Sequence, residues 1–129
     1  MDRKMFSLIV PTINRDIELK KLFDSLSHST NMNFEIFVID QNQDDRVEKI
    51  EKMFSNLEIT NIKVNFKGAT KARNYGIQFA TGKYVIFPDD DCEFMPDTLA
   101  TILEVIEETG ADMVCLLYTS DAADESLPV

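Results

Sequence analysis

The chain has 129 residues, a formal net charge of −10 and an apolar fraction of 44%, which is enough to bury the core of one ordered domain. The acidic balance argues against nucleic acid and anionic membrane surfaces as partners, because basic side chains bind both. No run approaches the roughly 20 apolar residues of a membrane span, and the N-terminus lacks an apolar signal region. The two cysteines, Cys92 and Cys115, form neither a disulfide framework nor a zinc pattern, so we expect a cytoplasmic protein.

Four apolar runs alternate with four helical patterns along the chain. The strand-like runs are residues 6–10, 34–39, 59–66 and 84–87. Apolar residues at helical spacing follow them at residues 19–26, 47–54, 69–80 and 99–106. The third run alternates, which predicts a strand with one wetter face, and the fourth predicts a buried strand. This order predicts an α/β fold with a mostly parallel sheet flanked by helices on both faces.

Single residues are expected to mark the ends of several elements. Pro11 is expected to stop the first strand, because proline has no amide hydrogen to donate. Asp16 and Asp97 stand where helix caps are expected, and Gly110 is expected to end the last helix. A fifth strand is expected to begin at Met113.

Charged side chains follow the strands at what the fold predicts to be one edge of the sheet. Ligands of open parallel sheets bind outside the carboxyl ends of the strands. The residues at these ends are Pro11, Thr12 and Arg15, then Asp40, then Lys67, and finally Asp89, Asp90 and Asp91. Acids and bases at one edge predict a site for a charged ligand bridged by a metal.

Three adjacent carboxylates, Asp89, Asp90 and Asp91, follow the fourth strand and Pro88. They repel one another unless a cation neutralises them, and carboxylate oxygens are preferred ligands of divalent cations. A metal site is therefore one interpretation. A solvated acidic turn before the last helix explains the triplet alone equally well.

The third helical pattern carries an arginine on its packing face. Placed at 100° per residue, this face consists of Ala69, Ala72, Gly76, Phe79 and Ala80, and Arg73 falls inside the same arc. A guanidinium at such a seam needs an acceptor, and a phosphate at the strand ends would suit it. The alternative is that Arg73 extends to the edge or pairs with a structural carboxylate.

Taken together, the motifs resemble the nucleotide-binding half of a family 2 glycosyltransferase of the GT-A fold. The matching segments, in the family's order, are residues 7–12, 35–40, 67–69, 72–76, 82–87, 89–91 and 96–99. The resemblance implies a truncated GT-A-type domain. It also implies an inverting, metal-dependent transfer of a sugar from a nucleotide-diphosphate donor, typically UDP-linked, to an unidentified glycan, lipid or other hydroxyl acceptor.

The resemblance implies that four of these residues hold the nucleoside. Pro11 and Thr12 would pack beside the base, with Arg15 close by, and Asp40 would hydrogen-bond a base that is typically uracil. The family often has a second acid and a glycine after the residue matching Asp40, where this chain has Gln41 and Asn42. An amide can still hydrogen-bond a base edge, so nucleotide binding is retained while the choice of uridine stays open.

The remaining residues are implied to hold the diphosphate and its metal. Arg73 would face the pyrophosphate, with Lys67 nearby. Asp91 would contact Mn²⁺ or Mg²⁺, and Asp89 and Asp90 would reach the metal, its waters or the ribose. The bound cation would act as a Lewis acid on the departing diphosphate.

The last residues interrupt this resemblance. Residues 115–125 resemble a translated sequencing adapter, so we expect the domain to span residues 1–114 and residues 115–129 to be a non-native tail. The alternative is a true fifth strand over residues 113–118 with a polar tail. Family members continue further, and the general base that activates the acceptor is expected downstream, so we expect this fragment to be inactive alone. Membrane association of a longer parent, at the inner face, stays open.

Two other functions also agree with the sequence pattern. A nucleotidyltransferase-like α/β domain would use the same acids on a nucleoside triphosphate. A non-catalytic module would use the same residues to bind a nucleotide without catalysing a reaction. The sequence contains no glycine-rich dinucleotide fingerprint, phosphate loop or nucleophile elbow.

Overall fold

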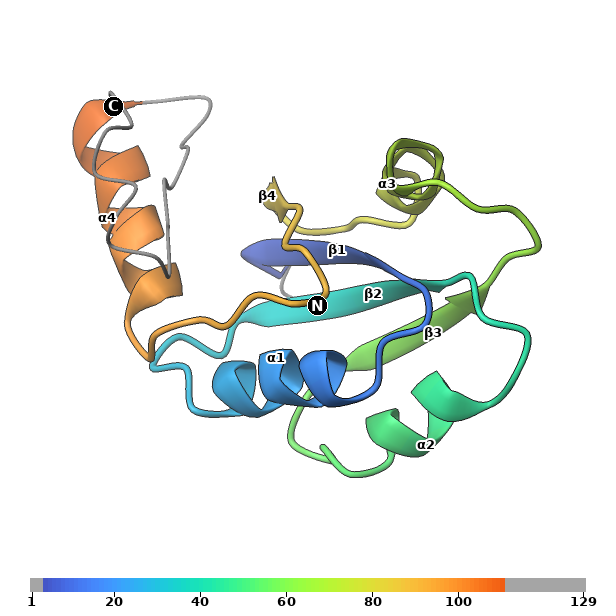
Figure 1. Cartoon of the computed structure of the whole chain (residues 1–129). Coiled ribbons are helices and arrows are strands. Elements are labelled where there is room, and N and C mark those ends of the chain that lie inside the picture. Colours follow the sequence, from blue (N-terminus) through green and yellow to red (C-terminus); the bar gives the residue numbers. More distant parts are fainter. Residues whose placement is uncertain (1–3, 111–129) are drawn as a thin grey trace, which may run out of the picture.

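The computed structural model describes residues 4–110 and has a four-stranded sheet at its centre (Figure 1). The strands are all parallel, in the order β3-β2-β1-β4. The elements are β1 (Phe6–Thr12), α1 (Ile17–Ser27), β2 (Phe34–Asp40), α2 (Arg46–Glu51), β3 (Ile59–Lys63), α3 (Ala69–Ile77), β4 (Tyr84–Ile86) and α4 (Thr98–Thr109). This order confirms the fold class that the sequence predicts. The expected fifth strand lies outside the described residues.

Helices cover both faces of the sheet, as the apolar strands require. Helices α1 and α2 lie on one face and α3 on the other (Figure 1). The larger core joins β1 and β2 to α1, α2 and α4, and Phe6, Phe23 and Leu99 are among its fully buried members. The smaller core places Ala72 of α3 against Ile9 and Ile39. Alternate residues of β1 and β2 therefore supply two separate cores.

The first strand continues through Pro11 to Thr12, so the prediction that proline stops it is wrong. Pro11 lies opposite Ile39 in the parallel ladder. The Thr12 carbonyl accepts a hydrogen bond from the Gln41 amide at 3.0 Å, on the β2 side. The adjacent Pro11 therefore faces the β4 side, where pairing has already ended at Leu8. Its missing amide hydrogen costs no ladder bond there.

The fourth strand is less buried than its apolar sequence predicts. It pairs with β1 over three residues and lies at the end of the strand order, and Val85 is 36% exposed. Phe87, expected in this strand, follows its end and is 41% exposed. The third strand is also shorter than predicted and ends at Lys63. Short apolar runs do not reveal whether a strand is central or at an edge.

The predicted helix ends agree in position but not in every contact. Asp16 and Asp97 occupy the N-cap positions of α1 and α4, yet neither side chain caps its helix by a hydrogen bond. The Asp16 carboxylate instead pairs with Arg46 at 3.1 Å. Gly110 ends α4 in the left-handed conformation, with φ of 69°, which glycine adopts without steric cost.

The face of α3 that packs on the sheet is narrower than predicted. Ala72 and Gly76 are buried, whereas Ala69 is exposed and Phe79, 36% exposed, lies beyond the end of the helix. A Cβ built on Gly76 would lie 2.6 Å from Ile9 Cγ2. A glycine at this position therefore lets the helix approach the sheet closely.

The close approach at Gly76 predicts that Gly76→Ala lowers stability, although alanine favours helices. Overpacking against Ile9 and Ile39 is expected to cost about 1–3 kcal/mol in the free energy of unfolding. Urea denaturation measures this change. Asn74→Ala, on the exposed side of the same helix, serves as the control and is expected to be neutral or stabilising. Equal stability of Gly76→Ala and the parent would contradict the packing account.

A buried carboxylate fixes the opposite end of the sheet. Glu35 Oε2 accepts hydrogen bonds from the Ser7 hydroxyl at 2.6 Å and from the Thr81 hydroxyl and amide at 2.6 and 3.0 Å. Burial raises the pKa of Glu35, but these hydrogen bonds outweigh it, so the pKa lies below the ordinary value. The ionised carboxylate thereby anchors the segment between α3 and β4 to the two central strands.

Glu35→Gln is expected to lower the free energy of unfolding by about 1–3 kcal/mol at pH 7, because a neutral amide oxygen accepts the three hydrogen bonds of Oε2 more weakly than an ionised carboxylate does. A depressed pKa stabilises the fold above the ordinary pKa of glutamate and loses that effect as pH falls through the folded-state pKa. The difference between the two proteins should therefore narrow in acid. Chemical denaturation from pH 7 to pH 3 tests this, with the exposed Glu107→Gln as control. A difference independent of pH would contradict it.

Candidate functional site

Three strands end side by side with polar residues in one row. Thr12, the last residue of β1, lies opposite Asp40 of β2, and Asp40 lies opposite Lys63 of β3. Thr12 and Asp40 are buried, whereas Lys63 is partly exposed. The parallel register therefore assembles a hydroxyl, a carboxylate and an ammonium at the carboxyl edge of the sheet.

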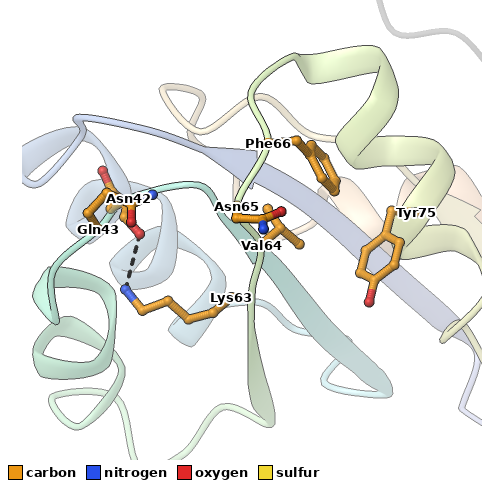
Figure 2. Close-up of a pocket in the computed structure, with 7 residues that line it drawn as sticks. All are labelled: Asn42, Gln43, Lys63, Val64, Asn65, Phe66 and Tyr75. Atoms are coloured by element: carbon orange, nitrogen blue, oxygen red, sulfur yellow. Dashed lines mark hydrogen bonds between the residues drawn. The ribbon is translucent and has the colours of Figure 1, made fainter.

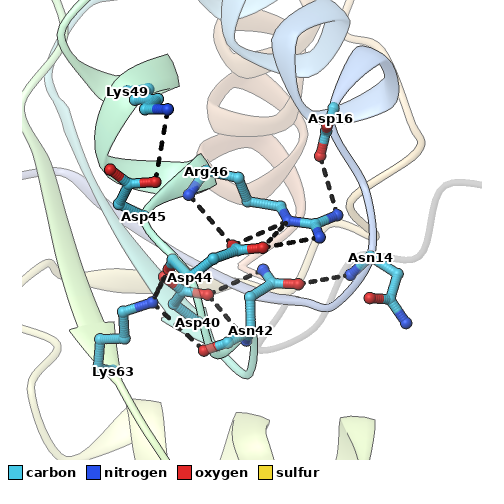
Figure 3. Close-up of polar contacts among 9 residues, drawn as sticks. All are labelled: Asn14, Asp16, Asp40, Asn42, Asp44, Asp45, Arg46, Lys49 and Lys63. Carbon is cyan, nitrogen blue, oxygen red and sulfur yellow. Dashed lines mark hydrogen bonds and ion pairs between the residues drawn. The ribbon is translucent and has the colours of Figure 1, made fainter.

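Asp40 is fully buried (Figure 3), and its two carboxylate oxygens differ: Oδ1 accepts hydrogen bonds, whereas Oδ2 has an ion-pair contact but no hydrogen-bond partner within the described residues. Oδ1 accepts hydrogen bonds from the Asn42 amide at 3.0 Å and from its side-chain Nδ2 at 2.9 Å. Oδ2 lies 3.2 Å from Lys63 Nζ. A buried charge requires such partners, because an unpaired one costs several kcal/mol. Asp40 is thus held in one orientation by protein groups.

The two amides that replace the family's acid and glycine are used inside the protein. Gln41 donates to the Thr12 carbonyl at 3.3 Å and accepts from the Gly68 amide at 2.7 Å. Asn42 Oδ1 accepts from the Asn14 amide at 2.7 Å, where Asn14 has a positive φ of 57°. Gln41 and Asn42 therefore hold the loops after β1 and β3 in place. The base contact suggested for these amides stays a prediction.

Two arginines converge on the acidic loop from different elements. Arg73 of α3 donates from Nη2 to Asp89 Oδ1 at 3.1 Å, and its Nε is buried without a hydrogen-bond partner among residues 4–110. Arg15, from the loop after β1, lies 3.6 Å from Asp90 Oδ1. In the structure Arg73 pairs with a carboxylate, and its contact with a phosphate stays a prediction. Lys67 is exposed in the loop between β3 and α3.

The acids of the triplet have different environments. Asp90 is shielded, with 14% of its side chain exposed, whereas Asp89 and Asp91 are exposed. Burial raises the pKa of Asp90, and the charges of Asp91 and Asp89 add to this, while Thr12 and Arg15 oppose it. Burial also raises the pKa of the neighbouring Cys92 thiol to about 11, so it is not a thiolate nucleophile at neutral pH.

The acids alone do not form a closed metal site. Among residues 4–110, no three His, Cys, Asp or Glu side chains converge closely enough to hold an ion. Mg²⁺ and ions of similar chemistry are commonly bound by one or two carboxylates together with substrate phosphates and water. The oxygen donors of Asp89, Asp90 and Asp91 fit that second kind of site, in which the ligand completes the coordination.

A pocket of about 550 Å³ opens beside this row of residues (Figure 2). Its lining combines amides, a lysine and two aromatic rings. The residues are Asn42, Gln43, Lys63, Val64, Asn65, Phe66 and Tyr75. Sequence reasoning did not select Lys63, because only the register between β2 and β3 places it opposite Asp40.

A sheet of parallel strands with acids and bases at its carboxyl edge is the arrangement of a ligand-binding α/β domain. The model of glycosyl transferase family 2 matches residues 7–126. The chain therefore belongs to glycosyl transferase family 2. In the described part of the chain, no helix is long and apolar enough to cross a membrane.

Relatives and solved structures agree with this assignment. A glycosyltransferase of Haemophilus influenzae is 37% identical over 105 residues, which are 81% of this chain and 35% of that protein. AmsB, the amylovoran biosynthesis glycosyltransferase of Erwinia amylovora, is 32% identical over 122 residues. The match covers 88% of this chain and 40% of AmsB. The crystal structure of Staphylococcus aureus TarS with UDP has a TM-score of 0.76 at 29% identity, covering 84% and 33% of the two chains. The chain thus spans well under half the length of each.

The shielded position of Asp90 predicts that Asp90→Asn raises the thermal stability of the ligand-free protein. A raised pKa means that ionisation is less favourable in the folded state, so stability falls as pH rises through the folded-state pKa. The asparagine removes that effect, and the melting temperature at pH 7 is expected to rise by roughly 2–4 °C. The gain should shrink in acid, where Asp90 is protonated.

Melting curves in the presence of a metal chelator, from pH 7 to pH 4, measure this difference. Asp24→Asn, at an exposed position in the middle of α1, is the matched control and should leave the melting temperature unchanged. A lower melting temperature for Asp90→Asn at pH 7 would show that its carboxylate stabilises the free protein.

Proposed function

We propose that this chain is the donor-binding part of an inverting, metal-dependent glycosyltransferase that takes a nucleotide-diphosphate sugar, with UDP as the first candidate. The observation that carries the proposal is the convergence of Arg73 and Arg15 on Asp89 and Asp90 at the carboxyl edge of the sheet. Two guanidinium groups beside two carboxylates provide sites for a diphosphate and for its counter-ion. Family membership supports the reaction type.

In this proposal, Arg73 binds the diphosphate and the acidic loop binds its metal. Arg73 exchanges its exposed contact with Asp89 for phosphate oxygens, which match its planar fork better than one carboxylate oxygen does. Asp91 and Asp89 then hold Mn²⁺ or Mg²⁺, with Asp90 directed to the ribose or to water. A bound cation supplies charge stabilisation to the departing diphosphate. The mannosyltransferase PcManGT of Pyrobaculum calidifontis, a fold neighbour at 24% identity and a TM-score of 0.72, has a solved structure in complex with GDP-Man and Mn²⁺.

The nucleoside is proposed to lie along the row at the strand ends. Pro11 and Thr12 are the groups expected beside it. In this proposal Asp40 is buried beneath the base site and holds neighbouring side chains in position. The structure of TarS with UDP-GlcNAc, at 28% identity, is a further precedent for such a ligand. The acceptor hydroxyl and its general base are left unassigned, so the proposal for this chain concerns donor binding.

The proposal predicts that the chain binds UDP in the presence of Mn²⁺ and loses most of that affinity in Asp91→Ala. Isothermal titration calorimetry at fixed salt measures both. Arg73→Gln should weaken UDP binding by roughly tenfold or more, because a charge-assisted phosphate contact is lost. Asp24→Ala, which removes an acid from the exposed side of α1, should bind as the parent does.

Binding of UDP that is unaffected by Mn²⁺ and by Asp91→Ala would contradict the metal assignment. Binding of CTP or GTP at least as tight as that of any nucleotide sugar would favour nucleotidyl transfer instead. Affinity unchanged in both Arg73→Gln and Asp89→Ala would remove the proposed site altogether.

A further inference from the structure

The pocket beside the strand ends has one polar wall and one aromatic wall. Asn42, Gln43 and Lys63 line one side, and Phe66 and Tyr75 lie on the other (Figure 2). The two rings contact each other edge to face, with centroids 5.8 Å apart. A flat heteroaromatic ring with polar substituents suits such a lining, because its face meets aromatic groups while its edge meets donors and acceptors. A nucleobase has this chemistry.

The position of the pocket in the sheet fixes which part of a nucleotide it would meet. The acidic loop follows β4, whereas Lys63 ends β3, at the other side of the strand order. Three strand spacings separate them, roughly 14 Å. A nucleoside diphosphate held by its phosphates at the acidic loop therefore presents the far edge of its base to Lys63, the edge that carries position 4 of a pyrimidine or position 6 of a purine.

Asp40 does not itself line this pocket. Its side chain has no exposed surface: Asn42 donates two hydrogen bonds to Oδ1, and Oδ2 forms an ion pair with Lys63 without a hydrogen bond. A base in the pocket meets the lysine first. Asp40 instead holds the ammonium group in position, with the ion pair buried on the carboxylate side.

Lys63 has donors that a base can use. Its side chain is 42% exposed, and Nζ donates to the carbonyl of Asn42 at 3.3 Å and to that of Asp44. The Asp44 contact is exposed, so a ligand oxygen can replace this carbonyl without desolvation of a buried group. The buried contact with Asp40 remains in place during the exchange.

We propose that Lys63, positioned by Asp40 opposite the aromatic wall, determines base specificity by donating a hydrogen bond to a carbonyl oxygen on the far edge of the base. Uracil and guanine carry a carbonyl there, and both are favoured. Cytosine and adenine carry an amino group, which would place a donor against a donor and leave both unsatisfied. The proposal rests on the proposed function, in that the phosphates must first bind at the acidic loop.

Competition of UDP with CDP tests the assignment, measured by titration calorimetry of the chain with Mn²⁺ at fixed salt. The parent is expected to bind UDP at least tenfold more tightly than CDP. Lys63→Met is expected to reduce this ratio to within threefold, mainly by weakening UDP, while Lys63→Arg keeps a preference for UDP. Lys49→Met, which removes an exposed lysine of α2, is the matched control and should keep the parent ratio.

The ratio of two affinities within one protein is insensitive to a general loss of folded material, and melting curves of each variant check the fold. If Lys63→Met keeps the full preference for UDP over CDP, or if the parent has no preference, the assignment of Lys63 is wrong while nucleotide binding stands. If the parent binds neither nucleotide with Mn²⁺, the proposed function itself fails.

Discussion

The parallel register between β1 and β2 is the constraint on which the rest of the structure depends. Seven residue pairs end with Thr12 opposite Asp40, and the same row continues to Lys63 in β3. The row sets where the loops begin, so it determines which side chains share the carboxyl edge. A shift of one residue would turn Asp40 to the other face of the sheet, away from the amides that hold it.

The charges at this edge are balanced in two different ways. Asp40 and Lys63 form a pair whose carboxylate has no exposed surface, and removing one partner of such a pair is costly. The Arg73–Asp89 pair has a carboxylate that is 67% exposed, and exposed pairs contribute little to stability. The first pair is therefore a fixed part of the protein, whereas the second can be exchanged for a ligand at small cost.

Sequence periodicity predicted the helices and strands because the spacing of apolar residues that produces each element lies within one short segment. The order of strands and helices, the end of α4 at Gly110 and the partial burial of Arg73 on α3 all follow from it. The passage of β1 through Pro11 and the exposure of Val85 did not follow. Both depend on which strand lies on each side, and that is a property of the whole sheet.

Gly76 and Lys63 show which relations between residues a local pattern predicts and which it does not. Gly76 lies three residues after Arg73 on α3, so helical spacing alone links the close approach of the helix to the position of the guanidinium. Lys63 meets Asp40 only because β2 and β3 pair with one particular register, across the intervening residues 41–62, which include α2. A lysine on an alternating, half-exposed strand is an ordinary solvent-facing residue by pattern. Its proximity to a buried carboxylate, and hence its value as a donor to a ligand, is a consequence of tertiary pairing that no local pattern contains.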